Sequence, residues 1–177
     1  MARGAEAHYP AAFTTTVEPM TTTRTAVRYE DDFYTWSQEQ ATALRRAAKS
    51  RANLSDPLDF ENLAEEIESL GISQQRELYS RYAVILLHLL KWQYQPGRRS
   101  RSWRASIRTQ RREIAELLLI SPGLKPKRRA QLARAYIGAR EDAAEQTGLP
   151  IERFPELCPY TLEQVESGDW WPEGEPG

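Results

Sequence analysis

The segment from residue 73 to residue 95 constrains the fold of this chain more than any other. Its apolar residues recur every three to four positions, and further leucines make its middle apolar on almost all sides. A helix with that pattern is surrounded by other helices, so the segment predicts the centre of an all-helical domain. Its longest apolar run, Tyr82–Leu90, has nine residues, whereas a membrane-spanning helix needs roughly 20. We therefore expect a buried core helix and no membrane partner.

Helical periodicity and stop signals divide the rest of the chain into further helices. Pro57 suits a first helical position, Gly71 suits the residue after a helix end, and Pro96-Gly97 ends the next helix. We expect helices at about 31–51, 55–70, 73–95, 102–120 and 126–146, with a short helix near 162–166. No run of four or more residues alternates as a strand does. The predicted fold class is all-α, a compact helical bundle of about five main helices with a proline-rich C-terminal strap.

The first two predicted helices each carry an apolar stripe that we expect to face the core. The strap is expected to be pinned across the bundle by its large apolar side chains. The first stripe is Phe33, Trp36, Gln40, Ala43, Leu44 and Ala47, the second is Phe60, Leu63, Ala64, Ile67 and Leu70, and the strap residues are Phe154, Leu157, Tyr160, Trp170 and Trp171.

The ends of the chain predict little structure. Residues 1–28 contain a threonine-rich stretch without helical period, so we expect a disordered tail, and Met20 offers an alternative translation start that would make 1–19 a misannotated segment. Residues 29–172 are expected to form one helical domain and 173–177 a flexible C-terminus. The single cysteine, Cys158, cannot form an internal disulfide and favours a reducing cytoplasm. With two histidines and one cysteine, we expect no metal site and no cofactor.

Charge is distributed unevenly along the chain. Residues 1–90 carry 9 basic and 13 acidic residues, residues 91–134 carry 13 and 2, and residues 135–177 carry 2 and 10. The central basic block is either an anion-binding surface or the partner of the acidic segments in a bundle. We expect internal pairing, because the helices of a bundle are neighbours.

Several short motifs of the sequence resemble those of one family of bacterial helical proteins. They include the run from Asp59 to Gly71 (DFENLAEEIESLG), the run from His88 to Pro96 (HLLKWQYQP), Ser102-Trp103, Gln110-Arg111, Phe154-Pro155, Cys158-Pro159-Tyr160 and Trp171-Pro172. Together they are similar to the signature of domain of unknown function 29 over roughly residues 29–172. The resemblance implies an all-helical bacterial protein, abundant in cyanobacteria, that begins shortly before Tyr29. It implies no activity.

The arginine-rich junction before residue 102 is the strongest candidate for ligand contacts. Guanidinium groups bind phosphate bidentately, and a helix start adds amide donors. The overall pI of about 6.2 is low for a dedicated nucleic-acid binder. The candidate anion or nucleic-acid contacts are Arg98, Arg99, Arg101, Arg104, Arg108 and Arg111.

A polar network around His88 is the other candidate site. His88 lies among leucines, and with the acids of helix 55–70 it could serve proton transfer. The pattern lacks any Glu-x-x-His pair of a di-iron site and any known catalytic motif. The candidate network residues are Glu65, His88, Lys91 and Gln110.

These observations leave three functional hypotheses. The leading one is a helical protein-interaction or scaffold module without chemistry of its own, acting with an unknown protein partner. The alternative is a nucleic-acid or phosphate-binding accessory protein that uses the arginine-rich junction. The third is an unrecognised enzyme centred on His88 and the acids of helix 55–70. An exposed apolar patch of more than a few hundred Å² favours the first, an exposed basic surface the second, and a cleft holding His88 beside two carboxylates the third.

Overall fold

The computed structural model describes residues 26–50 and 58–173, and within these residues it is helical and contains no strand. The all-α prediction is confirmed. Most of the predicted tail, including Met20, lies outside the described residues, as do residues 51–57 and 174–177. The α-helices are α1 (Phe33–Ser50), α2 (Phe60–Tyr94), α3 (Arg101–Ile120), α4 (Arg128–Thr147) and α5 (Leu162–Glu166), joined by the short 3-10 helices η1 (Pro96–Arg98), η2 (Pro122–Lys127) and η3 (Ile151–Arg153).

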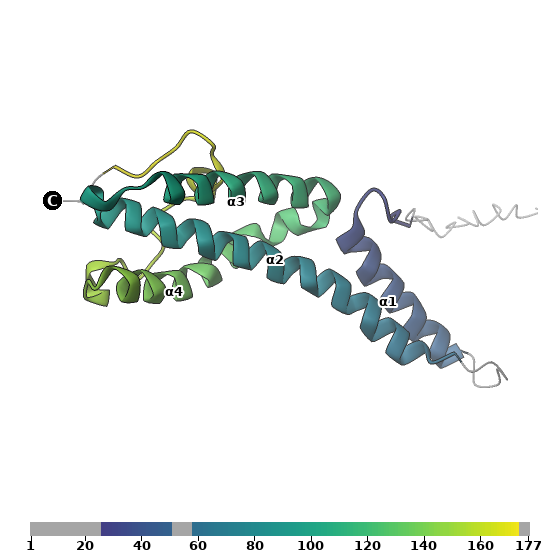
Figure 1. Cartoon of the computed structure of the whole chain (residues 1–177). Helices are drawn as coiled ribbons and strands as arrows, with labels where there is room; N and C mark the ends of the chain where they lie inside the picture. The colour runs from purple at the N-terminus through teal and green to yellow at the C-terminus, as the bar shows by residue number, and fades with distance from the viewer. Residues whose placement is uncertain (1–25, 51–57, 174–177) are drawn as a thin grey trace, which may run out of the picture.

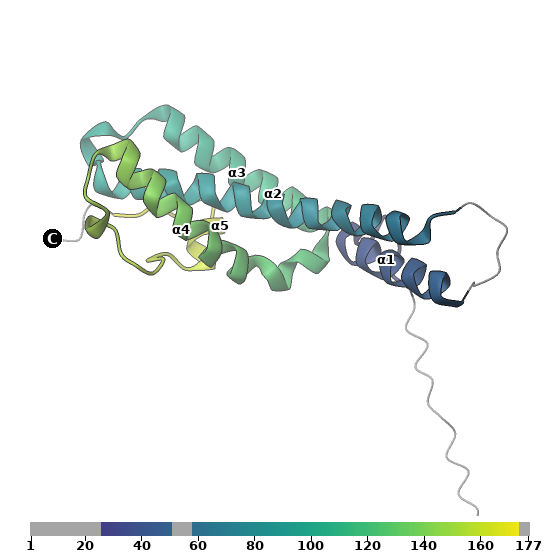
Figure 2. The same cartoon turned by 90° about the horizontal axis from the view of Figure 1, so that it is seen from below.

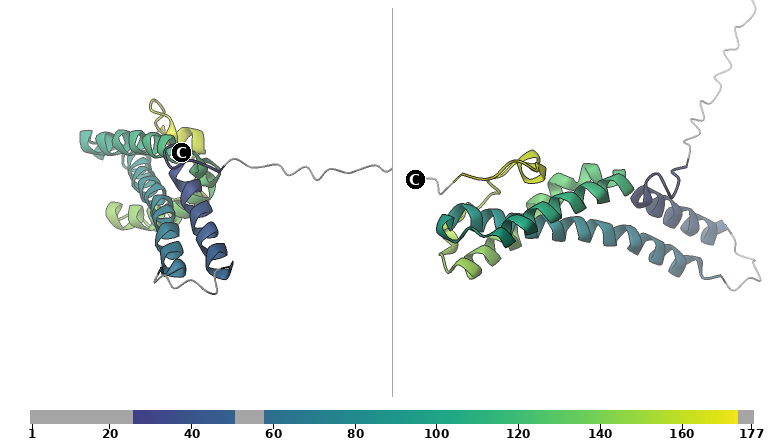
Figure 3. Two further views of the ribbon diagram at one scale, coloured as in Figure 1. Left: turned by 90° about the vertical axis from the view of Figure 1, so that its right-hand side faces the viewer. Right: turned by 45° about the horizontal axis from the view of Figure 1, so that its top comes forward.

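Helix α2 is the spine of the molecule. Its 35 residues span about 50 Å at ~1.5 Å per residue. Helices α3 and α4 flank its C-terminal part, and α1 runs antiparallel to its N-terminal part (Figure 1 and Figure 2). We call α1 together with residues 60–72 of α2 the arm, because these two helices project away from α3 and α4 (Figure 3).

The predicted break at Gly71 is wrong, because the expected helices 55–70 and 73–95 are one continuous helix. Gly148, which ends α4, is the one described residue with a positive φ, at 70°. Gly71 instead lies buried in α2 against α1, where a Cβ atom would meet the Ser37 hydroxyl and the Gln38 amide. Its role is therefore close approach of two helices.

The main core is formed by α2, α3, α4 and the C-terminal segment. On α2 the predicted inward residues Leu78, Tyr82, Ile85, Leu86 and Leu89 are fully buried, which confirms its central position. Helix α1 contributes only Tyr34 to this core cluster. The other residues of this cluster come from α2 (Leu90, Tyr94), α3 (Ile107, Ile114, Leu117, Leu118), η2 (Leu124), α4 (Leu132, Ala135, Tyr136, Ala139, Ala143) and the segment after α4 (Phe154, Tyr160, Leu162, Val165).

The C-terminal segment crosses the bundle and is held by apolar and polar contacts. Phe154 and Tyr160 are buried as expected, but Leu157 is 83% exposed, so its predicted pinning role is wrong. Two α4 side chains donate hydrogen bonds to the backbone of the segment, Arg140 Nε to Phe154 O (3.0 Å) and the Tyr136 hydroxyl to Pro155 O (2.6 Å). No helix within the described ranges is long and apolar enough to span a bilayer.

Candidate interaction surfaces

The side of α1 that packs on α2 is not the apolar stripe predicted from the sequence. The buried residues of α1 are Tyr34, Ser37 and Ala41. Opposite them on α2, Ala64 and Gly71 are buried. The two helices of the arm therefore meet through mostly small residues, and the predicted inward position of the first stripe is wrong.

Apart from Ala64, which is buried in the contact with α1, most apolar members of the two predicted stripes lie on one side of the arm. On each helix a stripe residue precedes a buried one, as Trp36 precedes Ser37 and Leu63 precedes Ala64. Successive residues of a helix point about 100° apart. Residues one position before the contact residues therefore project to the same side of two packed antiparallel helices. The arm face comprises Phe33, Trp36, Leu44 and Ala47 of α1 and Phe60, Leu63, Ile67 and Leu70 of α2.

The arm face is partly accessible, and at its base the Tyr29 ring packs edge-on against Phe33 and Trp36. Leu63 is 41% exposed and Leu70 is 49% exposed, and the other members of the face are only partly buried. At the base of the arm, the rings of Phe33 and Trp36 stack with centroids 5.9 Å apart. An apolar surface that two helices share in this way is typical of a protein contact.

Polar interactions occupy the opposite side of the arm. Arg45 pairs with Glu68 at 2.6 Å, and the Gln75 amide donates to the Tyr34 hydroxyl at 2.5 Å. Arg45, Glu68 and Gln75 each lie four residues after a buried position of their helix, on the side of the contact away from Leu63 and Leu70. The arm therefore has one apolar side and one polar side.

The arginine-rich junction lies at the other end of α2, around η1 and the start of α3. Arg98, Arg99, Arg101, Arg104 and Arg108 are all exposed, and none of them forms an ion pair with another described residue. Within the described residues, the expected pairing of the basic block with the acidic segments, such as the acids of residues 59–68, is therefore not found at this junction. Since α2 is continuous, those acids lie near the opposite end of the spine.

The second half of the basic block does pair internally. Arg128 contacts Glu166 at 2.8 Å, and Arg129 contacts Glu163 at 3.3 Å, so α4 and α5 neutralise each other. Glu166 also accepts a 2.5 Å hydrogen bond from the Tyr82 hydroxyl, and burial, followed by this hydrogen bond, raises the pKa of Tyr82.

Arg111 is separated from the other candidate arginines by burial, with 6% of its surface exposed. Its Nε donates to Val165 O at 2.8 Å, and its Nη2 donates to Gln164 O at 3.2 Å and Trp170 O at 3.0 Å. Burial lowers its pKa to about 10, which leaves it charged at neutral pH. Arg111 thus holds the C-terminal segment on α3, a role that the sequence analysis missed.

The structure does not bring the predicted polar network together. Glu65 is exposed on the arm, 23 residues before His88 on the same helix and so roughly 35 Å away at ~1.5 Å per residue. Lys91 donates to Gln146 at 2.8 Å, and Gln110 accepts from Arg81 at 3.1 Å. Residue His88 is half-buried, and within the described chain its Nδ1 atom has no hydrogen-bond partner. Among the described residues, no group of three or more His, Cys, Asp and Glu side chains that could hold a metal is formed, around His88 or elsewhere.

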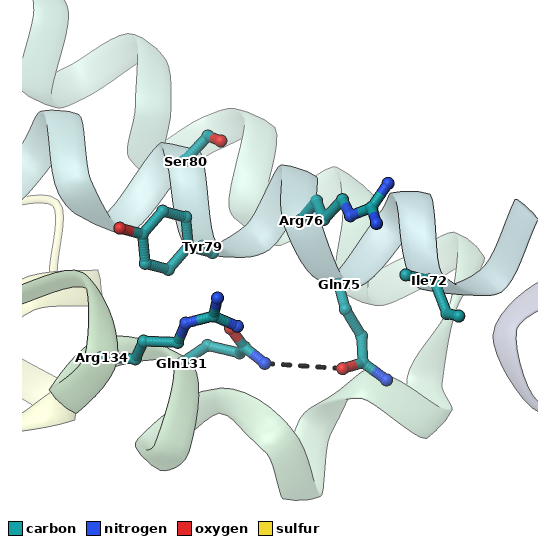
Figure 4. A pocket seen from close by; sticks show the side chains of 7 residues that line it. All are labelled: Ile72, Gln75, Arg76, Tyr79, Ser80, Gln131 and Arg134. Carbon is teal, nitrogen blue, oxygen red and sulfur yellow. Dashed lines mark hydrogen bonds between the residues drawn. The ribbon is translucent and has the colours of Figure 1, made fainter. Parts of the chain in front are cut away.

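A polar hollow lies where α2 and α4 diverge at the base of the arm (Figure 4). The Gln131 amide approaches Gln75 Oε1 at 3.5 Å, and the Arg134 guanidinium lies 5.2 Å from the centre of the Tyr79 ring. Its lining combines basic and neutral polar side chains, so it lacks the carboxylate–histidine pairing of a general acid–base site. The lining residues are Ile72, Gln75, Arg76, Tyr79, Ser80, Gln131 and Arg134.

Comparison with known proteins places the chain in a family. Residues 28–171 match the family described as "Domain of unknown function DUF29". The chain is similar in structure to a crystallised alpha-helical protein of unknown function from Rhodospirillum rubrum, with a TM-score of 0.65, 27% sequence identity and coverage of 81% of this chain and 92% of that one. A comparison with curated proteins gives no significant match. The family match covers most of the chain, and this protein belongs to the DUF29 family.

Proposed function

We propose that this protein is a helical interaction module that associates with a second copy of itself through the arm face. The observation that carries the proposal is the set of partly exposed apolar side chains that α1 and α2 share on one side of the arm. Two helices alone leave such a surface in water, and packing against a second helical pair is the usual way to bury it. Of the three functional hypotheses, a protein-interaction role therefore has the most structural support.

The size of the arm face suits a moderate interface between two copies. Helices about 10 Å in diameter and about 20 Å long present roughly 400 Å² per copy in projection. Pairing two such corrugated faces would bury on the order of 1,000 Å², which lies at the lower end of specific interfaces. We therefore expect a reversible dimer that dissociates on dilution.

The charges of the arm favour a second copy as the occupant. Apart from the Arg45–Glu68 pair within the arm, helix α1 carries Arg46 and Lys49 against one acid, whereas residues 60–72 of α2 carry three further glutamates and no basic residue. A twofold axis along the arm places α1 of each copy opposite α2 of the other. Basic and acidic helices then face each other on both sides of the interface, which gives one surface complementary to itself.

Sedimentation velocity across about 1 µM to about 1 mM tests the proposal, because that range covers interfaces of this size. We expect the full-length protein to change from a monomer of 20.4 kDa to a dimer as concentration rises. The double variant Leu63→Glu/Leu70→Glu introduces charge into the arm face at exposed positions and is expected to stay monomeric with an unchanged helical content.

A matched control places the same charges elsewhere. Leu119 on α3 and Ile137 on α4 are 76% and 64% exposed and lie outside the arm, so Leu119→Glu/Ile137→Glu is expected to dimerise like the unmodified protein. A monomer at every concentration, or equal loss of dimer in both double variants, would contradict the proposal. Monomeric behaviour throughout would leave a different protein as the occupant of the arm face.

We further propose a bacterial origin and a cytoplasmic location. The similar protein of known structure comes from a bacterium, which supports the first. The single cysteine supports the second, since Cys158 donates to Tyr160 O at 3.4 Å and burial raises the pKa of its thiol. Fractionation of the native host, with immunodetection of the protein in cytosolic and membrane fractions, tests the location, and recovery with the membranes would contradict it.

A further inference from the structure

The junction between α2 and α3 has the composition of an anion site. A hollow there is lined by Trp92, Arg99, Ser100, Arg101 and Arg104. The three arginines are exposed, and none is neutralised by an acidic side chain within the described part of the molecule. Three cations without a described acidic partner around one hollow attract an anion.

Two of these arginines are held in position by tryptophan rings. The Arg99 guanidinium lies 5.1 Å from the centre of the Trp92 ring, and its Nε donates to Trp92 O at 2.9 Å. The Arg104 guanidinium lies 5.4 Å from Trp92 and 5.8 Å from Trp171, and the two rings are 4.8 Å apart. Stacking restrains a guanidinium while its terminal N–H groups remain available to a ligand.

The surroundings add further positive potential. Ser100 caps α3 by accepting from Trp103 N at 3.2 Å, and the first turn of α3 contains no acidic residue. The positive end of this helix is therefore not neutralised locally. The buried Arg111 guanidinium lies 5.4 Å from the same Trp171 ring that Arg104 contacts. A ligand that carries more than one negative charge gains most from this arrangement.

We infer that the hollow formed by Arg99, Ser100, Arg101 and Arg104 binds a phosphate group. Phosphate offers several oxygens to neighbouring guanidinium groups, which contact it bidentately, and the Ser100 hydroxyl adds a neutral polar contact. Both a free phosphate compound and the backbone of a single nucleic-acid strand present this group. The site lies at the opposite end of α2 from the arm tip (Figure 1), so the inference does not depend on dimer formation.

Binding of two probes to the full-length protein tests the inference. Isothermal titration calorimetry with tripolyphosphate represents a free phosphate compound, and fluorescence anisotropy with a labelled oligothymidylate represents a strand. The variant Arg99→Gln/Arg101→Gln/Arg104→Gln is expected to lose binding, by about tenfold or more. In the control, the equally exposed Arg46, Lys125 and Lys127 are changed to Gln, which removes the same charge elsewhere, and binding is expected to be retained.

The outcomes distinguish a nucleic-acid strand from a free phosphate compound as the ligand, and they also test whether the site binds phosphate at all. Tighter binding of the oligonucleotide, with a logarithmic salt slope of about −2 at about −0.7 per neutralised phosphate, would assign the site to a strand. Equal or tighter binding of tripolyphosphate would assign it to a free phosphate compound. No binding of either probe at about 0.15 M salt, equal losses in both triple variants, or equally tight binding of polyglutamate would overturn the inference.

Discussion

Arg111 provides a quantitative test of how the C-terminal segment is attached. Arg111→Met keeps most of the aliphatic stem and removes all donors to Val165 O, Gln164 O and Trp170 O. Hydrogen bonds that involve a charged group contribute about 1.5–3 kcal/mol each. The variant also removes a buried charge whose Nη1 has no described partner, and this relief of desolvation offsets part of the loss. We expect the free energy of unfolding to fall by about 2–4 kcal/mol.

Urea unfolding monitored by circular dichroism and by tryptophan fluorescence measures this loss. Because Trp170 and Trp171 lie on the attached segment, we expect their emission to shift to longer wavelength before the helices unfold. Arg112→Met is the matched control. The Arg112 side chain is 64% exposed, and its contacts with Glu113 and Glu116 are 3.6 and 3.9 Å long. Such surface pairs contribute about 0–1 kcal/mol. A loss in Arg111→Met below about 1 kcal/mol, or equal to that of the control, would refute the reasoning.

Three further changes test the core, the arm and His88. Leu86 is fully buried, so Leu86→Ala should lower the free energy of unfolding in urea by about 2–5 kcal/mol, and a loss below about 1 kcal/mol would place Leu86 outside the core. Gly71→Ala should cost about 1 kcal/mol, because overpacking of about 1–3 kcal/mol exceeds a helix-propensity gain of about 1 kcal/mol. Gly138→Ala, whose new Cβ would come no closer than 3.7 Å to Tyr79, should stabilise the protein. A change in the free energy of unfolding with the same sign in both variants would contradict the close approach of α1 and α2 at Gly71. Burial, followed by the charge of Lys91, lowers the pKa of His88. The unfolded state then binds more protons, and stability falls as pH drops below about 6.5. Between pH 7.5 and pH 5.5, the free energy of unfolding measured in urea should decrease less for His88→Gln than for the unmodified protein.

Local sequence signals predicted most of the helices, because their termini depend on neighbouring residues. Ser100 caps α3 and Gly148 ends α4 in the left-handed region, as their positions in the sequence indicate. The predicted helix end at Gly71 is wrong because a glycine after a helix end and a glycine at a close helix crossing look alike in a single sequence. Only the position of α1 distinguishes them, and that is a tertiary property.

Apolar periodicity identified the stripes of the arm but not what covers them. The contact between α1 and α2 uses Ser37, Ala41, Ala64 and Gly71, which contribute little to a hydrophobic pattern. The larger side chains were therefore assigned to the core, although they form the accessible arm face. Periodicity reports which side of a helix is apolar, whereas the partner of that side is set by the packing of whole helices.

The candidate arginines could not be separated by composition alone. Arg111 differs from the others by its spacing, because it lies four residues after Ile107 and three before Ile114, both buried on α3. That spacing is a signal in the sequence for a buried arginine. That the exposed arginines form no ion pair within the described ranges depends on the continuity of α2, which separates them from the acids of the arm.

The distance between two labelled arms tests the central claim, that the arm face contacts a second copy. A nitroxide attached through Leu63→Cys in a Cys158→Ser background lies on the arm face, and one attached through Ile137→Cys lies on α4. Facing helices pack about 10 Å apart. Pulsed electron–electron double resonance at high protein concentration should therefore give a distance below about 30 Å between the two nitroxides at residue 63 of the two copies. The label at residue 137 should give a longer distance or none. Absence of any dipolar interaction at residue 63, or a shorter distance at residue 137, would contradict the account.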